Sequence, residues 1–167
     1  MGTERAQGVR EGGLDRHNRV YVLGAFVCDE ERPRESSVFG APSDFAGVRD
    51  YLELPQSGPL RLRNSLILKL CRGLTLLPSA VGVPAQPLVG NLVVRLVGPK
   101  GQVAKPHTRV IRFDAQSVIV RESIQLQGIE ISDFGIYGFE VSFAGAVLTI
   151  VPLMVGPCGV LKATVAN

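Results

Sequence analysis

The chain has 167 residues, of which 46% are apolar and 20% charged, a composition typical of one folded globular domain. The formal net charge is +3, and the sequence shows neither an apolar run of about 20 residues nor an N-terminal apolar segment of the signal-peptide type. Three widely spaced cysteines, Cys28, Cys71 and Cys158, argue against a secreted disulfide framework. We therefore expect a cytoplasmic protein without membrane contact.

The first third of the chain predicts a tail, a strand and an irregular segment. Residues 1–17 contain few large apolar side chains, and we expect disorder there. Residues 19–28 place apolar side chains on both faces, which predicts a strand covered on both sides. Residues 29–59 contain four prolines, and within them Ser43 precedes apolar residues at helical spacing, which predicts a short helix.

Three strands are predicted in the middle of the chain. Residues 60–71 alternate leucines with basic or polar residues, which indicates a half-buried strand with a basic solvent face. Residues 92–97 and 103–113 form two further predicted strands, joined by a tight turn at residues 98–101. Pro106 places the second of these strands at a sheet edge or at a bulge, because proline cannot donate to a ladder.

Two less regular segments flank these strands. Residues 73–87 contain three prolines and no clean period, so we predict a loop. Residues 118–131 alternate in two pieces, and Gly128 resets the phase between them, which predicts a bulge or bend.

The strongest local signal is a hairpin over residues 136–154. The turn is predicted at residues 144–145, although Asn-Gly would suit it better than Ala-Gly. Pro152 then falls at a hydrogen-bonded position, so the ladder is expected to end or bulge there. The predicted core-facing pairs are Phe143 with Ala146, Val141 with Leu148, Phe139 with Ile150, and Tyr137 with Pro152.

Together these elements predict an all-β fold. Seven or eight short strands, with one or two short helices in loops, fit a two-layer antiparallel β-sandwich, and a closed barrel is the alternative. The predicted organisation is a disordered tail at residues 1–17, the sandwich at residues 18–155 and a C-terminal extension at residues 156–167.

Several strand-and-turn segments share a recognisable pattern: VYVLGAF at 20–26, VRL at 94–96 leading into GPKG at 98–101, and GIYGF at 135–139 leading into the turn at 144–145. These segments resemble those of a bacterial family of small β-sandwich proteins of unknown function. The resemblance extends over roughly residues 19–155 and implies a fold, without an activity or site residues.

No motif commits the chain to a catalytic reaction, a cofactor or a metal. The sequence contains neither a nucleophile elbow nor a glycine-rich phosphate loop. A Cys–His pair would join Cys71 or Cys158 to His107, and the three cysteines with His107 lack the local spacing of a zinc site. Glu130 and Asp133 could bind a cation or act in acid–base chemistry, but a solvated turn is the simpler interpretation.

Charge is the one unevenly distributed property. Residues 60–112 contain nine of the eighteen Lys and Arg residues and none of the fifteen Asp and Glu residues. If the strands of this segment adjoin, they form a basic sheet face that can attract nucleic acid or another polyanion; otherwise acidic neighbours neutralise it within the fold. The candidate polyanion-binding residues are Arg61, Arg63, Lys69, Arg95 and Arg109.

Three functions are therefore open. The first hypothesis is a non-catalytic binding or assembly module that self-associates or docks on a protein partner. The second is polyanion or nucleic-acid binding through residues 60–112. The third is an enzyme with a site under the loop at residues 29–59.

Overall fold

A computed structural model describes residues 19–33, 43–55, 58–73, 87–114 and 119–158 of the chain. Eleven strands occupy these ranges, and no helix occurs in them. The all-β fold class is therefore confirmed. The described part of the chain holds no helix with the length and apolar character needed to cross a membrane.

The strands form two large sheets and one small one. The four-stranded sheet has the order β2-β1-β5-β8, and the five-stranded sheet has the order β3-β11-β10-β6-β7. Neighbours in both sheets are antiparallel, except that β3 runs parallel to β11. The first sheet comprises β1 (Val20–Pro33), β2 (Ser43–Arg49), β5 (Ser65–Arg72) and β8 (Ile119–Gln125). The second comprises β3 (Tyr51–Leu54), β6 (Leu88–Val97), β7 (His107–Phe113), β10 (Gly135–Phe143) and β11 (Ala146–Pro157), while β4 (Leu60–Arg61) pairs with β9 (Glu130–Ile131).

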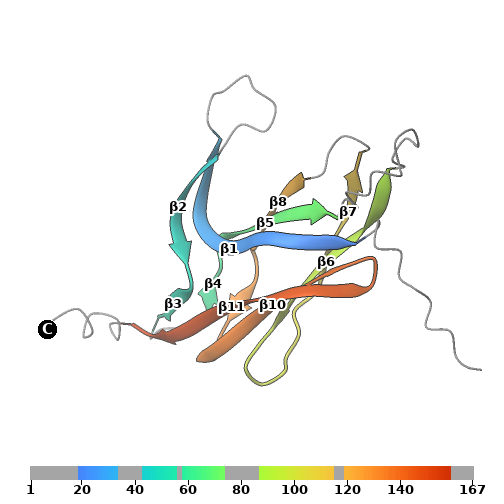
Figure 1. Cartoon of the computed structure of the whole chain (residues 1–167). Coiled ribbons are helices and arrows are strands. Elements are labelled where there is room, and N and C mark those ends of the chain that lie inside the picture. The colour runs from blue at the N-terminus through green and yellow to red at the C-terminus, as the bar shows by residue number, and fades with distance from the viewer. Residues whose placement is uncertain (1–18, 34–42, 56–57, 74–86, 115–118, 159–167) are drawn as a thin grey trace, which may run out of the picture.

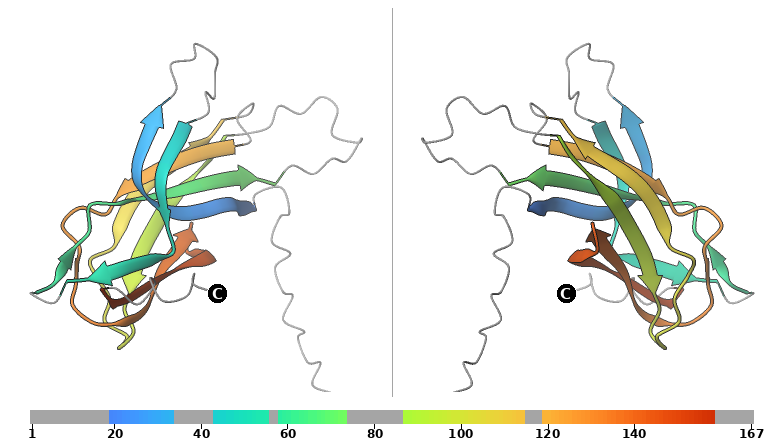
Figure 2. Two further views of the ribbon diagram at one scale, coloured as in Figure 1. Left: turned by 90° about the vertical axis from the view of Figure 1, so that its left-hand side faces the viewer. Right: turned by 90° about the vertical axis from the view of Figure 1, so that its right-hand side faces the viewer.

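The two large sheets face each other in a sandwich-like arrangement, with β1 and β5 above β10 and β11 in the view of Figure 1. Side views show the strands of the two layers crossing at an angle (Figure 2). Inward-facing side chains of both layers make one apolar cluster, which includes Leu66, Leu68, Ile124, Leu92, Phe113, Phe139, Val141 and Leu153. Burial of this cluster is the main term that holds the layers together.

The predicted helix beginning at Ser43 is wrong, because the segment forms β2 and β3 instead. Strand β1 continues to Pro33 and bends upward in its second half, where β2 pairs with it (Figure 1). The Phe45 ring lies edge-on to the Phe26 ring, with centroids 4.9 Å apart. Gly47 has φ of +62°, a conformation that interrupts a helix. Tertiary pairing with a long neighbouring strand outweighs the local helical spacing.

The hairpin is confirmed, but its predicted register is wrong from Leu148 onward, since Ser142 still pairs with Val147. Phe143 pairs with Ala146 as predicted, and the turn lies at residues 144–145. Leu148 is then an extra residue in β11, so Val141 pairs with Thr149. The remaining core-side pairs are Phe139 with Val151 and Tyr137 with Leu153, while Ile150 and Pro152 face outward. Tyr137, Phe139, Val141 and Phe143 are buried as predicted.

This bulge also explains how the ladder continues past Pro152. The Met154 amide donates to the Asp50 carbonyl at 2.8 Å, toward the outer edge of β11. Residues two apart in a strand direct their backbone groups to the same side, so the Pro152 nitrogen faces that outer edge too. Strand β3 joins β11 only from Met154 onward. Pro152 therefore costs no ladder bond, and the prediction that pairing ends there is wrong.

Three predictions from turn chemistry are confirmed. The Gly101 amide donates to the Gly98 carbonyl at 2.9 Å, which closes the turn at residues 98–101. Strand β7 begins directly after Pro106 and lies at an edge of the five-stranded sheet. Gly128, with φ of +90°, lies in a turn between β8 and β9.

The boundaries of the described strands differ slightly from the predictions. The strand predicted at residues 60–71 is divided into β4 and β5. Strand β11 runs to Pro157, two residues past the predicted end of the sandwich at residue 155. The predicted tail at residues 1–17, most of the loop at 73–87 and most of the extension at 156–167 lie outside the described residues.

The turn between β10 and β11 yields a stability prediction. Ala144 and Gly145 have φ of +48° and +86°, as in a type I′ turn, and left-handed backbone is unfavourable for alanine. We expect Ala144→Asn to raise the free energy of unfolding by about 0.5–1 kcal/mol, since asparagine tolerates this conformation better. Urea denaturation measures the change.

Ala146→Asn is the matched control, because Ala146 is exposed on the same hairpin but has no positive φ. It should give no gain in stability. An equal or larger gain from Ala146→Asn would contradict the backbone explanation.

Candidate interaction face on the five-stranded sheet

The outer side of the hairpin is apolar. Because Tyr137, Phe139 and Val141 face the core, the residues next to them along β10 face outward. Their pairing partners on β11 face outward as well. The outward-facing cross-strand pairs are Ile136 with Met154, Gly138 with Pro152, Glu140 with Ile150, and Ser142 with Val147. We call Ile136, Val147, Ile150, Pro152 and Met154 the hairpin face.

The side chains of the hairpin face are strongly exposed. The exposed fractions are 61% for Ile136, 56% for Val147, 60% for Ile150 and 49% for Met154. Outward positions of an antiparallel sheet are usually polar when they face water, so a contiguous apolar group is unusual there. No strand, sheet or helix of the described residues covers this side.

One ion pair crosses the outer side of the same sheet. Arg95 on β6 and Glu140 on β10 lie opposite each other in the ladder, and the Arg95 guanidinium donates a hydrogen bond to Glu140 Oε1. Ile150 lies on the other side of Glu140. About half of the Arg95 side chain and a quarter of the Glu140 side chain remain exposed. The hairpin face is thus bordered by the Arg95–Glu140 pair toward β6 and by the exposed Glu53 of β3, which lies opposite Gly156, toward the other edge.

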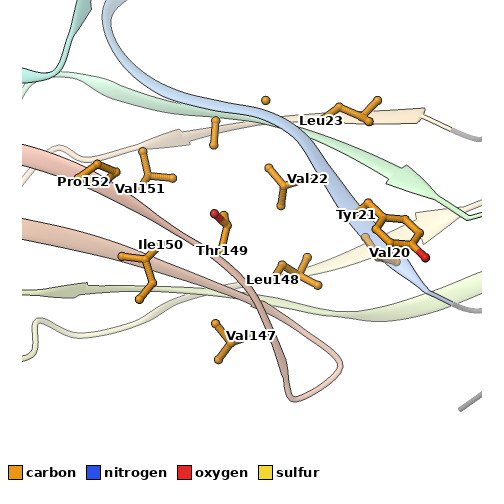
Figure 3. A pocket seen from close by; sticks show the side chains of 12 residues that line it. Val20, Tyr21, Val22, Leu23, Val147, Leu148, Thr149, Ile150, Val151 and Pro152 are labelled. Atoms are coloured by element: carbon orange, nitrogen blue, oxygen red, sulfur yellow. The ribbon is translucent and has the colours of Figure 1, made fainter.

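An open groove of about 530 Å³ lies beside the hairpin face, between the first halves of β1 and β11. Strand β2 joins β1 only from Val27 onward, so within the described residues this edge of β1, like that of β11, pairs with no strand. Val22 and Thr149 point into the space between the two strands, whereas Val147 and Ile150 point away from β1 (Figure 3). None of the twelve lining residues carries a charged side chain. The groove therefore offers apolar surface and backbone polar groups, without an acid or a base.

The five predicted polyanion-binding residues do not lie on one face. Arg61 lies on β4 of the small sheet, and Arg63 lies exposed between β4 and β5. Lys69 lies on β5 of the four-stranded sheet, whereas Arg95 and Arg109 lie on β6 and β7 of the five-stranded sheet. Since β5 and β6 belong to different layers, the continuous basic face that the hypothesis requires does not form.

Acidic residues from later in the chain neutralise much of the basic segment. Five of its nine basic residues form ion pairs, each with a carboxylate between residues 114 and 140. A hydrogen bond to Asp133, together with the charge of that carboxylate, raises the pKa of Lys100. The pairs are Arg61 with Glu130, Arg95 with Glu140, Lys100 with Asp133, Arg109 with Glu122, and Arg112 with Asp114. Polyanion binding stays a prediction, and this pairing weakens its basis.

The structure separates the candidates for a Cys–His pair. Cys71 is half-buried on β5 of the four-stranded sheet, whereas His107 is exposed at the start of β7. Neither Cys71 nor Cys158 forms a hydrogen bond with His107 among the described residues, and the Cys158 Sγ lies 3.1 Å from Glu53 Oε2. Within the described ranges, no three His, Cys, Asp or Glu side chains converge as a metal site would require.

The remaining acidic candidates are engaged by basic side chains. Glu130 accepts a hydrogen bond from Arg61 at 2.9 Å, and Asp133 accepts one from Lys100 at 2.5 Å. A polar hollow of about 460 Å³ touches the segment at residues 29–59 and is lined by Asp29, Glu30, Glu31, Ser65 and Gln125. Here Asp29 binds Arg49, and Glu31 binds Arg121. These carboxylates are held in structural ion pairs.

The hairpin face was missed because the predicted register placed Ile150 in the core. A signal for it was nevertheless present, since the two strands of this hairpin carry apolar residues at odd and even positions alike. One face of such a hairpin packs in the core, and the other must remain exposed or meet another surface.

Comparison with known proteins does not assign the chain to a family. No family model, no curated protein and no solved structure matches the chain. The resemblance to a bacterial family of small β-sandwich proteins therefore stays a prediction.

The three free cysteines yield a reactivity prediction. Burial, followed by the nearby charges of Glu31 and Asp29, raises the pKa of the Cys28 thiol, whereas Cys158 is exposed. Because the thiolate is the reactive form, we expect iodoacetamide at about pH 8 to modify Cys158 and spare Cys28 in the folded chain.

Mass spectrometry of the modified peptides would measure the rates at which Cys28 and Cys158 react with iodoacetamide. The control is the chain unfolded in guanidinium, in which Cys28 should react readily. Equal rates for Cys28 and Cys158 in the folded chain would contradict the buried position of Cys28.

Proposed function

We propose that the protein is a non-catalytic binding or assembly module that self-associates through the hairpin face. The observation that supports this most directly is the exposure of Ile136, Val147, Ile150 and Met154 on one side of one hairpin. Single exposed apolar residues are common on protein surfaces, whereas contiguous groups mark sites of association.

The chemistry of the surrounding surface supports a protein contact over a small-molecule site. The face is a sheet surface, and the adjoining groove has no charged lining residue. Small-molecule sites usually combine a concave apolar pocket with a few converging polar groups. A flat apolar sheet face instead resembles the buried side of a sandwich, which packs against a second sheet about 10 Å away.

The free state of all three cysteines supports a reducing compartment, and we propose the cytoplasm. A heterologous protein is the alternative partner, and it would contact the same apolar surface. Self-association and heterologous docking differ in one respect: only self-association makes the mass of the purified chain depend on its concentration.

Removing the apolar character of the face tests the proposal. We expect the wild-type chain to associate with increasing concentration, and Ile150→Lys to weaken this association at least tenfold, because it buries an unpaired ammonium in the contact. Sedimentation velocity over a concentration series measures both.

Val48→Lys is the matched control, because Val48 is 61% exposed but lies on β2 of the other sheet. It should associate as the wild type does. Wild-type chain that stays monomeric at every concentration, or Val48→Lys that is impaired as much as Ile150→Lys, would overturn self-association through the hairpin face.

A further inference from the structure

We infer that the occupant of the hairpin face is a second copy of the chain, packed face to face about a two-fold axis beside the Arg95–Glu140 pair. This inference rests on the proposed self-association and specifies its geometry. In the resulting dimer, Arg95 of each copy contacts Glu140 of the other copy as well as its own.

The charge of the surface permits such a contact. A two-fold contact joins the same patch on both copies, so the patch must be complementary to itself. The outer side of β11, β10, β6 and β7 carries two cations, Arg95 and Arg112, and one anion, Glu140, while Asp114 directly after β7 pairs with Arg112. With Asp114 included, its net charge is zero, although the chain as a whole carries +3. Two copies can therefore approach on this side without repulsion.

The positions of the two charges suit a two-fold axis. Arg95 and Glu140 lie directly opposite on neighbouring strands, with Ile150 next in the same row. Rotation by 180° about an axis that lies in the contact plane, parallel to the strands and between β6 and β10, exchanges their positions. It also places β10 and β11 of each copy over β6 and β7 of the other copy. Each guanidinium then lies over a carboxylate of the other copy, and both retain enough exposure to accept that contact.

The apolar remainder of the face surrounds this charged row. Ile136 and Met154 lie at one end of the hairpin, and Val147 lies toward the turn at the other end. These apolar side chains lie on either side of the central charged row, so the proposed contact has a polar centre with apolar surroundings. The contact area is small. The outer side of the four strands β11, β10, β6 and β7, which lie about 4.8 Å apart, covers roughly 450 Å² per copy, below the ~800 Å² that each partner buries in a standard interface. The dimer is accordingly expected to be reversible and concentration-dependent.

Charge reversal tests this geometry directly. In Arg95→Glu, two carboxylates meet two carboxylates across the axis, and in Glu140→Arg, guanidinium groups meet guanidinium groups. We expect each variant alone to sediment as a monomer at concentrations where the wild type is a dimer. An equimolar mixture of R95E and E140R should form a heterodimer, because all the charges across the axis are then opposite.

The doubly reversed variant R95E/E140R gives a second readout that preserves the ion pair within the chain. It should dimerise with itself as tightly as the wild type, yet it should not co-elute with affinity-tagged wild-type chain. In that mixed pair, Arg95 of the wild-type copy would meet the guanidinium that E140R introduces in the other copy. Untagged wild-type chain should co-elute with the tagged chain.

Arg109→Glu is the matched control, because Arg109 pairs with Glu122 between the two layers, away from the hairpin face. It should dimerise as the wild type does. Circular dichroism melting curves identify any variant that fails to fold, and the doubly reversed variant then serves as the test.

The outcomes separate the two proposals. A monomeric wild type removes both the proposed function and this inference. If the wild type associates and Ile150→Lys does not, self-association through the hairpin face stands. In that case, failure of folded R95E and E140R to combine, or free exchange of the doubly reversed variant with wild type, overturns the two-fold arrangement alone.

Discussion

One extra residue in β11, Leu148, determines which side chains of the hairpin meet the core. Without it, Ile150 would pair with Phe139, and the Pro152 nitrogen would face β10, where a ladder donor is required. With it, Val151, Leu153 and Val155 turn inward, and Pro152 turns to an edge that needs no donor there. The same shift exposes Ile150 and Met154. The core of the five-stranded sheet and its apolar outer face therefore have a single origin.

Charged side chains are distributed differently over the edges and the faces of the two large sheets. Edge strands β7 and β8 carry charged side chains, including Arg109, Arg112, Arg121 and Glu122, which oppose the addition of a further strand. The outer side of the hairpin lacks such protection apart from Glu140. These charges protect the edges at β7 and β8, whereas the first halves of β1 and β11 remain unpaired edges without charged side chains in the described part of the chain. The proposed contact between copies uses a sheet face instead of an edge.

The sequence predicts correctly those structural features that depend on neighbouring residues. It predicts wrongly those features that depend on contacts between residues far apart in the chain. The turns at residues 98–101 and 144–145 follow from local φ requirements, and the burial of Tyr137 and Phe139 follows from alternation. The bulge at Leu148 has no local marker, because Val147, Leu148 and Ile150 are equally apolar. The strand over residues 43–49 forms because β1 offers it an edge, and the basic face fails because β5 and β6 lie in different layers. Strand order is a property of the whole chain, which a window of ten residues does not contain.

The pairing of early cations with late anions has a consequence for synthesis. Residues 60–112 emerge from the ribosome with nine positive charges and no negative ones, and their five carboxylate partners follow only between residues 114 and 140. Until then the nascent chain carries an uncompensated cationic stretch next to the polyanionic RNA of the ribosome. The completion of β10 supplies the last of these five carboxylates, Glu140, in the same step that pairs β10 with β6. On this view, the attraction of the segment to polyanions is strongest in the unfinished chain and weakens as the five ion pairs form.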